Sequence, residues 1–196
     1  RFPRGVIECK YVISNTAVVV GMVATDDVYF AGIVRASVAL APELSCIVAA
    51  VSDAVVNRSA PRVLPLELPN AASWRPEQAW CDIGRSGHRH ASILKMQLLR
   101  HILRAGFSCF LADVDWQWGQ GAPFKGVHAV GVDVVTKRDE SGFLNLGSTF
   151  VRNTRETVRV VQRIANRVYV GWDQAIFTEE FSASAATCCT SNHLLM

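Results

Sequence analysis

Short apolar runs alternate with polar stretches in the first part of the chain. Thr16–Ala24 is continuous, apolar and rich in β-branched residues, which predicts a buried strand. Tyr29–Leu40 is longer and rich in Ala and Val, so we predict a helix that ends before Pro42. Cys46–Val51 is again short and apolar, as a second parallel strand would be. Together these runs predict a β-α-β unit.

A proline-rich stretch separates this unit from the next one. Asn57–Gly87 is rich in Pro, Asn, Ser and Arg, and its spaced prolines exclude any long regular element. These prolines are Pro61, Pro65, Pro69 and Pro76. We therefore predict a long excursion, and a structureless connection of this length in a compact domain is typical of a functional or variable segment.

A helical period begins at Ala91. Its apolar positions are Ile93, Met96, Leu99, Ile102 and Leu103, with Arg100 and Arg104 on the opposite face. Gly106 stands where a helix C-terminal cap belongs. Phe107–Ala112 then predicts a short buried strand, which places Asp113-Val114-Asp115 at the carboxyl end of that strand. Ligands bind at this end in open α/β sheets.

Two more strands are predicted after this point. They are His128–Val135 and Phe143–Arg152, and the polar segment Thr136–Gly142 is expected to form the turn between them.

Two helices are predicted to complete the chain. Asn153 and Glu156 have the spacing of a capping box, which indicates the start of the first. Its apolar face consists of Val158, Val161, Ile164 and Val168. Trp172–Phe181 predicts a shorter final helix.

Composition and charge narrow the classes of function. The 196 residues are 50% hydrophobic, which is enough for one domain with a sizeable core. The formal charge is only +3 without a concentrated basic stripe, so we expect no nucleic-acid partner. No apolar run approaches the roughly 20 residues that span a bilayer, so we expect no membrane anchor within this chain. The six cysteines form no Cys-x-x-Cys pair, which argues against a structural zinc site.

The Asp113-Val114-Asp115 segment is the strongest candidate for chemistry. Two carboxylates at i and i+2 just beyond a strand can both approach one cation, and oxygen ligands suit Mg²⁺ or Mn²⁺. Two surface aspartates in a turn are the simpler alternative. The apolar strand before them and the aromatic Trp116 and Trp118 after them favour a site, although we expect at least one of these tryptophans to pack in the core.

Three blocks of the second half resemble the nucleotide-diphospho-sugar transferases, a family that includes plant cell-wall arabinosyl- and xylosyltransferases. Lys95–Trp118 resembles the family's Lys, leucine-rich helix, Gly-aromatic, strand and Asp-Val-Asp succession. Phe143–Thr154 is similar to its Asn-Thr-Gly-Phe-x-x-Val-Arg-x-Thr segment, with Leu146 in place of its Thr. Trp172–Phe177 matches its Trp-Asp-Gln block. The blocks have the family's order and spacing.

The resemblance implies an α/β fold of the GT-A type, a Rossmann-like mixed sheet flanked by helices. It implies that Asp113 and Asp115 bind a metal, Mn²⁺ or Mg²⁺, and through it the diphosphate of a nucleotide-sugar donor. Asn145 and Gly147 match the family's Asn-x-Gly, which lies beside the donor sugar.

Further residues are carried over by the same resemblance. Asp173 and Gln174 are implied as catalytic residues that bind donor or acceptor hydroxyls, and Lys95 as a residue that meets a donor phosphate. Taken on their own, these residues also have structural interpretations. Asp173 could cap the last helix, Asn145 could satisfy a strand-edge amide, and the Lys95 side chain could extend along an exposed helix face.

The implied activity is transfer of a pentose or hexose from a nucleotide diphosphate to a glycan or glycoprotein acceptor. The resemblance implies a retaining, front-face reaction, in which the leaving phosphate helps to deprotonate the acceptor, and a location in the Golgi or another secretory-pathway lumen. Residues 1–196 are expected to form a single domain that is truncated at one or both ends. The loop after Asp115 departs from the family's pattern, and His193 is not embedded in the later segment that often supplies a metal-binding His.

Two alternatives stay open at this point. One is a degenerate or truncated domain that keeps the fold and serves as a binding or structural module. The other is a phosphatase of the haloacid dehalogenase type, which also places Asp-x-Asp after a buried strand and uses the first Asp as nucleophile. Gln117 argues against the phosphatase, because such sites ordinarily have Thr or Val at its position.

Overall fold

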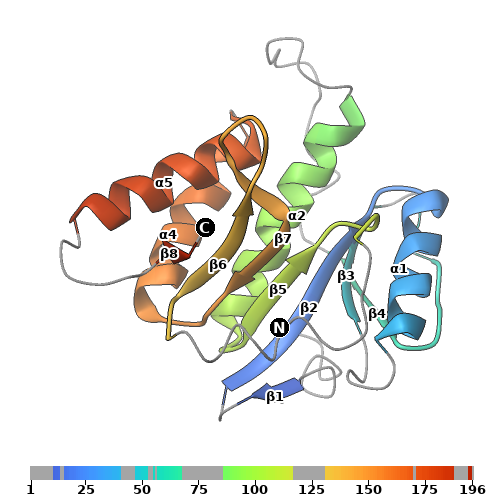
Figure 1. Cartoon of the computed structure of the whole chain (residues 1–196). Coiled ribbons are helices and arrows are strands. Elements are labelled where there is room, and N and C mark those ends of the chain that lie inside the picture. Colours follow the sequence, from blue (N-terminus) through green and yellow to red (C-terminus); the bar gives the residue numbers. More distant parts are fainter. Residues whose placement is uncertain are drawn as a thin grey trace.

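A computed structural model describes residues 11–13, 16–40, 47–52, 55, 57–67, 86–116, 131–169, 171–187 and 194–195 (Figure 1). Its strands are β1 (Tyr11–Ile13), β2 (Thr16–Ala24), β3 (Ile47–Val51), β4 (Val63–Glu67), β5 (Ser108–Ala112), β6 (Val134–Arg138), β7 (Leu144–Val151) and β8 (Leu194–Leu195). Its helices are α1 (Asp27–Ala39), α2 (Ser86–Arg104), α4 (Arg155–Arg167) and α5 (Asp173–Thr187).

The described strands form one mixed sheet in the order β4-β3-β2-β5-β7-β6-β8, with β1 paired to β2. Strands β4, β3, β2 and β5 run parallel, and their carboxyl ends therefore share one edge of the sheet. Strand β7 runs antiparallel to both β5 and β6. The predicted α/β fold with a Rossmann-like mixed sheet is confirmed.

Side chains alternate along the central strands and build a core on each face of the sheet. Helix α1 lies over one face, and α2, α4 and α5 lie over the other (Figure 1). In β5, Cys109 and Leu111 pack with α2, α4 and α5, whereas Phe110 and Ala112 pack with α1. The sequences of these strands are continuous apolar runs because helices cover both faces of the sheet. Each fully buried aliphatic or aromatic side chain contributes roughly 1.5–3 kcal/mol to folding.

Helix α2 has the predicted apolar face and the predicted glycine end. Gly106 has a φ of 92°, in the left-handed region. The N–H of Gly106 donates to Leu103 O at 3.0 Å, and the N–H of Phe107 donates to Ile102 O at 3.2 Å. These two bonds make a Schellman cap, which satisfies helix carbonyls that would otherwise lack partners. The helix begins earlier than predicted, at Ser86, and leads directly into β5.

The prediction of a structureless excursion over Asn57–Gly87 is wrong in one part. Val63–Glu67 forms β4, which pairs in parallel with β3, and Ala49 is the register partner of Pro65. A proline lacks an N–H donor but is tolerated on an edge strand, where only one neighbour requires backbone bonds. Among the described strands, β4 is the last one on this side of the sheet, so Pro65 does not exclude it.

The strand predicted at His128–Val135 was placed too early. Strand β6 covers Val134–Arg138, so Thr136 lies in a strand and not in the predicted turn. The hydroxyl of Thr136 donates to the carbonyl of Asn145 at 2.8 Å, which allows this polar residue to be buried in the sheet. Residues 128–130 lie outside the described part of the chain.

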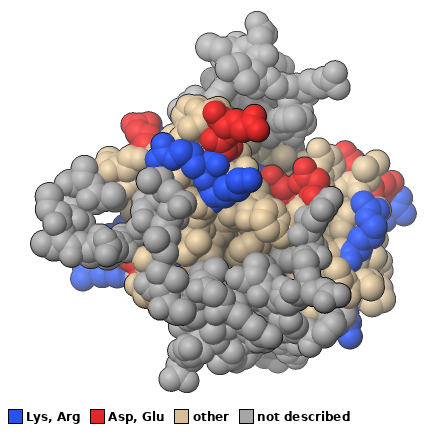
Figure 2. Space-filling view, in the orientation of Figure 1, with Lys and Arg blue, Asp and Glu red and all other residues tan. Residues whose placement is uncertain are grey.

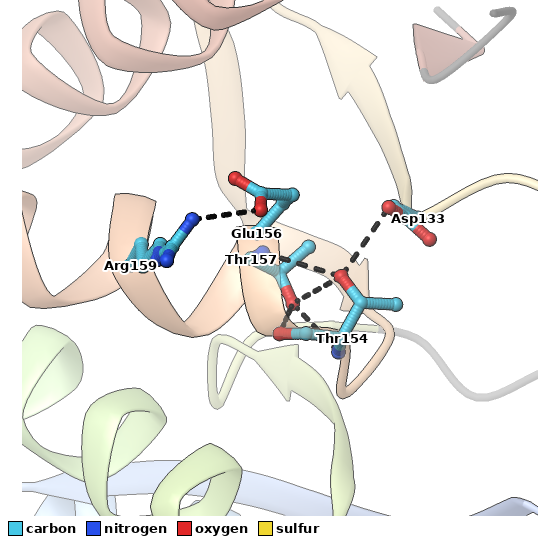
Figure 3. A network of polar contacts seen from close by, with 5 residues as sticks. All are labelled: Asp133, Thr154, Glu156, Thr157 and Arg159. Carbon is cyan, nitrogen blue, oxygen red and sulfur yellow. Dashed lines mark hydrogen bonds and ion pairs between the residues drawn. The ribbon is translucent and has the colours of Figure 1, made fainter.

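The N-terminal cap of α4 also differs from the prediction (Figure 3). Thr154 is the cap, and it exchanges hydrogen bonds with Thr157: each side-chain oxygen accepts the other residue's N–H, at 3.2 and 3.0 Å. Glu156 instead pairs with Arg159. The side chain of Asn153 donates to the carbonyls of Leu103 and Phe107, so it joins the start of α4 to the end of α2.

The final helix is longer than predicted, since α5 continues to Thr187. Within the described residues, none of the helices has the length and apolarity needed to span a bilayer.

We predict that Gly106→Ala lowers the free energy of unfolding by about 1 kcal/mol, because an L side chain resists the left-handed backbone of this cap. A Cβ there would meet no atom within 4 Å, so the cost comes from backbone conformation alone. Urea unfolding measures the change. Gly106→Asn is the matched control. Its free energy of unfolding should fall less, because Asn tolerates the left-handed backbone region better than Ala does. Equal losses in the two variants would contradict the assignment of the cap.

Candidate functional site

The Asp113-Val114-Asp115 segment forms a tight turn at the carboxyl end of β5. The N–H of Asp113 donates to Gly147 O at 2.9 Å, which extends the pairing with β7. The N–H of Trp116 donates to Asp113 O at 3.2 Å and closes the turn. The Trp116 ring lies edge-on to Phe110, with 6.4 Å between ring centroids. The prediction that one tryptophan packs against the core is confirmed for Trp116, and Trp118 lies outside the described residues.

Lys95 of α2 pairs with the first aspartate of this turn. Its Nζ lies 2.6 Å from Asp113 Oδ1, and the Lys95 side chain is 12% exposed while that of Asp113 is 42% exposed. Burial disfavours the ammonium, but the nearby carboxylates of Asp113, Asp173 and Asp115 outweigh it and raise the pKa of Lys95. The alternative that Lys95 extends along an exposed helix face is therefore wrong.

Asp173 lies at the first position of α5 and is only 4% exposed. Its Oδ1 accepts the N–H of Gln174 at 3.0 Å, and the hydroxyl of Ser92 also hydrogen-bonds its carboxylate. Burial raises the pKa of Asp173, while the charge of Lys95 and these two hydrogen bonds act in the opposite direction. Asp173 thus supplies a second carboxylate close to the buried ammonium.

Gln174 follows Asp173 and begins the attachment of α5 to β7. Its carbonyl accepts the hydroxyl of Thr178 at 2.7 Å, and that hydroxyl oxygen accepts the N–H of Leu144 at 2.8 Å. The side-chain Oε1 of Gln174 is buried and has no hydrogen-bond partner among the described residues. A buried amide oxygen without a partner is costly, which suits a group that receives a ligand's donor.

Asn145 and Gly147 lie on β7 beside the turn. Asn145 Oδ1 accepts the N–H of Gly147 at 2.6 Å, so Asn145 does satisfy a backbone amide. A Cβ on Gly147 would overlap Asp113 Oδ2 and would lie 2.9 Å from Asp113 Cγ. Glycine is therefore required here by the close approach of the Asp113 carboxylate to the β7 backbone.

The structure brings the predicted site residues together from four elements. Contacts join Lys95, Asp113, Gly147 and Asn145, and the charge of Lys95 couples Asp173 and Asp115 to them. Sequence reasoning missed Ser92. Its spacing of three residues from Lys95 places both on one face of α2, and this spacing was the signal available. His193 lies outside the described residues.

The carboxylates of Asp113 and Asp115 are suitable ligands for a divalent metal that also binds a substrate. Asp115 is exposed and Asp113 is partly exposed, and both offer the carboxylate oxygens that Mg²⁺ and Mn²⁺ prefer. Across the described residues, no group of three or more His, Cys, Asp or Glu side chains could hold a metal ion. Asp113 and Asp115 alone would occupy only part of the coordination shell of such a metal.

Charged side chains of both signs are interspersed on the face shown in Figure 2. Acidic and basic groups lie next to each other among the described residues of this face, rather than in one continuous basic surface. This mixture does not favour a polyanionic partner there.

We predict that Lys95→Met lowers the free energy of unfolding by about 1–3 kcal/mol, because it leaves the buried Asp173 and the partly buried Asp113 without their cation. The aliphatic stem is kept, so the loss reports the charge. Thermal or urea unfolding measures it. Lys137→Met, at an exposed position of β6, is the matched control and should change stability little. A loss no larger than that of the control would contradict the pairing.

Comparisons with known proteins identify the family of the chain. A sequence model of the nucleotide-diphospho-sugar transferase family matches residues 75–188, which is more than half of the 196-residue chain. Arabinosyltransferase RRA2 of Arabidopsis thaliana is 29% identical over 135 residues, a match that covers 54% of this chain and 31% of that protein. The chain thus spans less than a third of the length of this relative. From the matched residues and the fold, the chain belongs to the nucleotide-diphospho-sugar transferase family, with a GT-A-type α/β fold.

Proposed function

We propose that this protein is a metal-dependent glycosyltransferase that uses a nucleotide-diphosphate sugar. The observation that carries the proposal is the Asp113-Val114-Asp115 turn, which Lys95 and Gly147 hold at the carboxyl end of β5 in a member of this family. The carboxyl ends of parallel strands are where ligands bind in open α/β sheets. Family membership also removes the phosphatase alternative from consideration.

Asp113 and Asp115 would hold Mn²⁺ or Mg²⁺, and Lys95 would compensate part of the carboxylate charge. When bound, the metal would neutralise the diphosphate as it leaves. The Lys95 ammonium is close enough to Asp113 to fix one of its carboxylate oxygens, Oδ1, and so to orient the other. Lys95 would also bring a positive charge close to the phosphates, because its ammonium is paired with Asp113 of this turn.

The sugar of the donor would lie beside β7 and the start of α5. The unpartnered Oε1 of Gln174 can accept a sugar hydroxyl, and Gly147 admits the Asp113 carboxylate against the β7 backbone. The side-chain amide of Asn145 is fixed by its bond to Gly147, which orients its nitrogen for a further contact. Asp173 would act mainly by holding Lys95 and the first turn of α5, since its carboxylate is buried.

A retaining, front-face transfer agrees with this arrangement. In that reaction the bond from the anomeric carbon to the diphosphate oxygen breaks, the acceptor oxygen forms its bond on the same face, and the acceptor's proton passes to the departing diphosphate. Asp173 is poorly placed to act as a separate base because it is 4% exposed and already accepts two hydrogen bonds. The proposal therefore assigns proton uptake to the leaving group.

For the substrates, we propose a pentose donor and a glycan or glycoprotein acceptor. The support is the similarity to an arabinosyltransferase, of which this chain covers 31%. We propose the Golgi or another secretory-pathway lumen as the location, on the strength of the family resemblance alone.

Calorimetry with UDP and GDP, each with and without Mn²⁺, tests the donor site. We expect one nucleotide to bind only when Mn²⁺ is present, and we expect Asp115→Asn to weaken that binding at least about tenfold, because it removes one charged metal ligand. Glu156→Gln is the matched control, since it removes one exposed carboxylate on α4, away from the turn.

Either of two outcomes would contradict the proposal. Failure of both nucleotides to bind the native chain would favour a degenerate domain that serves as a binding or structural module. Equal weakening by Asp115→Asn and Glu156→Gln would mean that general charge, and not the turn, attracts the metal and nucleotide.

Gly147→Ala tests the placement of Asp113. The added Cβ must displace the Asp113 carboxylate, because it would lie 2.9 Å from Cγ and overlap Oδ2. We predict metal-dependent nucleotide binding that is weaker by about one to two orders of magnitude. Gly142→Ala is the control. A Cβ there would meet no atom within 4 Å, so this substitution adds only backbone strain, because Gly142 has a φ of 86°. Unchanged binding in Gly147→Ala would contradict the proposed site.

A further inference from the structure

Helix α1 contains a buried glycine that faces the middle residue of the Asp-Val-Asp turn. A Cβ on Gly32 would lie 3.0 Å from Val114 Cβ, 3.5 Å from Val114 O and 3.6 Å from Val114 Cγ2. Cβ contacts as short as the first are rare, so the helix and the turn touch closely at this point. Gly32 thus leaves a notch in α1 that receives Val114.

The two faces of the sheet explain why Val114 meets α1. Along β5, Leu111 belongs to the core under α2 and Ala112 to the core under α1. Continuing this alternation, Asp113 reaches Lys95 of α2 and Val114 reaches Gly32 of α1. The turn is therefore held from both sides: by an ion pair on one face and by a close backbone contact on the other.

Space, and not backbone conformation, accounts for the glycine. Gly32 lies inside a regular helix and does not have the positive φ that would require glycine. Alanine is the better residue in a helix interior, so glycine is unfavourable at this position unless a neighbour needs the room. Val114 is that neighbour, because its Cβ, carbonyl oxygen and Cγ2 are the nearest atoms to the missing side chain.

The N-terminal turn of α1, shortly before Gly32, also carries polar contacts. Asp26 caps the helix by accepting the N–H of Tyr29 at 3.0 Å. Arg58 makes two hydrogen bonds to the Asp27 carboxylate, each 2.9 Å long. The Asp26 cap and the Arg58–Asp27 pair stabilise the first turn of α1, and we expect an added side chain at position 32 to push the turn that contains Val114.

We propose that Gly32 is a positioning residue for the metal and diphosphate site: by admitting Val114 into α1, it sets where Asp113 and Asp115 lie. This inference rests on the proposed function of the turn. Gly32 touches neither metal nor donor in this account, and it acts only through Val114.

The test uses the whole chain and the variants Gly32→Ala and Gly32→Ala/Val114→Gly. We expect Gly32→Ala to keep its unfolding temperature close to that of the native chain, to shift the amide resonances of Val114 and Asp115, and to bind Mn²⁺ with UDP or GDP about tenfold more weakly. The double variant transfers the missing Cβ to the other partner, so binding should recover at least in part. Electron paramagnetic resonance of Mn²⁺ provides the spectroscopic measure of the bound metal.

Gly21→Ala is the matched control for crowding. Its added Cβ would lie 3.2 Å from Ile102 Cδ1 and 3.2 Å from Leu98 Cδ2, on the face of the sheet under α2. It should leave metal and nucleotide binding unchanged.

The failures of the two proposals are distinguishable. If the native chain binds metal and nucleotide but Gly32→Ala binds equally well, or if Gly21→Ala weakens binding as much, the role of Gly32 is overturned while the donor site stands. If the native chain binds neither nucleotide with Mn²⁺, the proposed function is overturned, and the positioning role falls with it.

Discussion

The buried ammonium of Lys95 is the constraint around which the site is built. A charge that is mostly removed from water is stable only beside opposite charge, and here the carboxylates of Asp113, Asp173 and Asp115 supply it. These carboxylates come from the turn after β5 and from the start of α5, and Lys95 itself comes from α2. The 2.6 Å ion pair joins α2 to the turn after β5, and the charge of Lys95 also couples the start of α5 to them.

Close backbone packing gives the turn its second constraint. Gly147 on β7 lets the Asp113 carboxylate approach the strand, and Gly32 on α1 lets Val114 approach the helix. An acidic turn that only needed to be solvated would not require either glycine. Rigid placement of the carboxylates suits a site whose ligand is a metal shared with a diphosphate, because small displacements of such groups weaken binding and slow the reaction.

Most of the fold could be predicted because its central strands are continuous apolar runs and its helices are periodic. Thr16–Ala24 matches β2 in full, and Gly106 marks the end of α2. The errors have local causes. Pro65 argued against a strand at β4, because a proline is compatible only with an edge position, which the sequence does not reveal. Thr136 argued against the observed extent of β6, because its hydroxyl finds a partner only across the strand pair. The aspartate pair and its neighbours could be named from motifs. The burial of Lys95 beside Asp173 depends on α5 packing against α2, which no local pattern encodes.

The most direct test of the account is paramagnetic broadening of backbone amide resonances by Mn²⁺ in the presence of the nucleotide that binds. If the turn after β5 holds a metal against a diphosphate, substoichiometric Mn²⁺ should broaden the amides of Asp113–Trp116, Asn145, Gly147 and Gln174 first, and only when the nucleotide is present. Broadening that is independent of nucleotide, or that is spread over exposed carboxylates such as Glu156 and Glu179, would contradict the central claim.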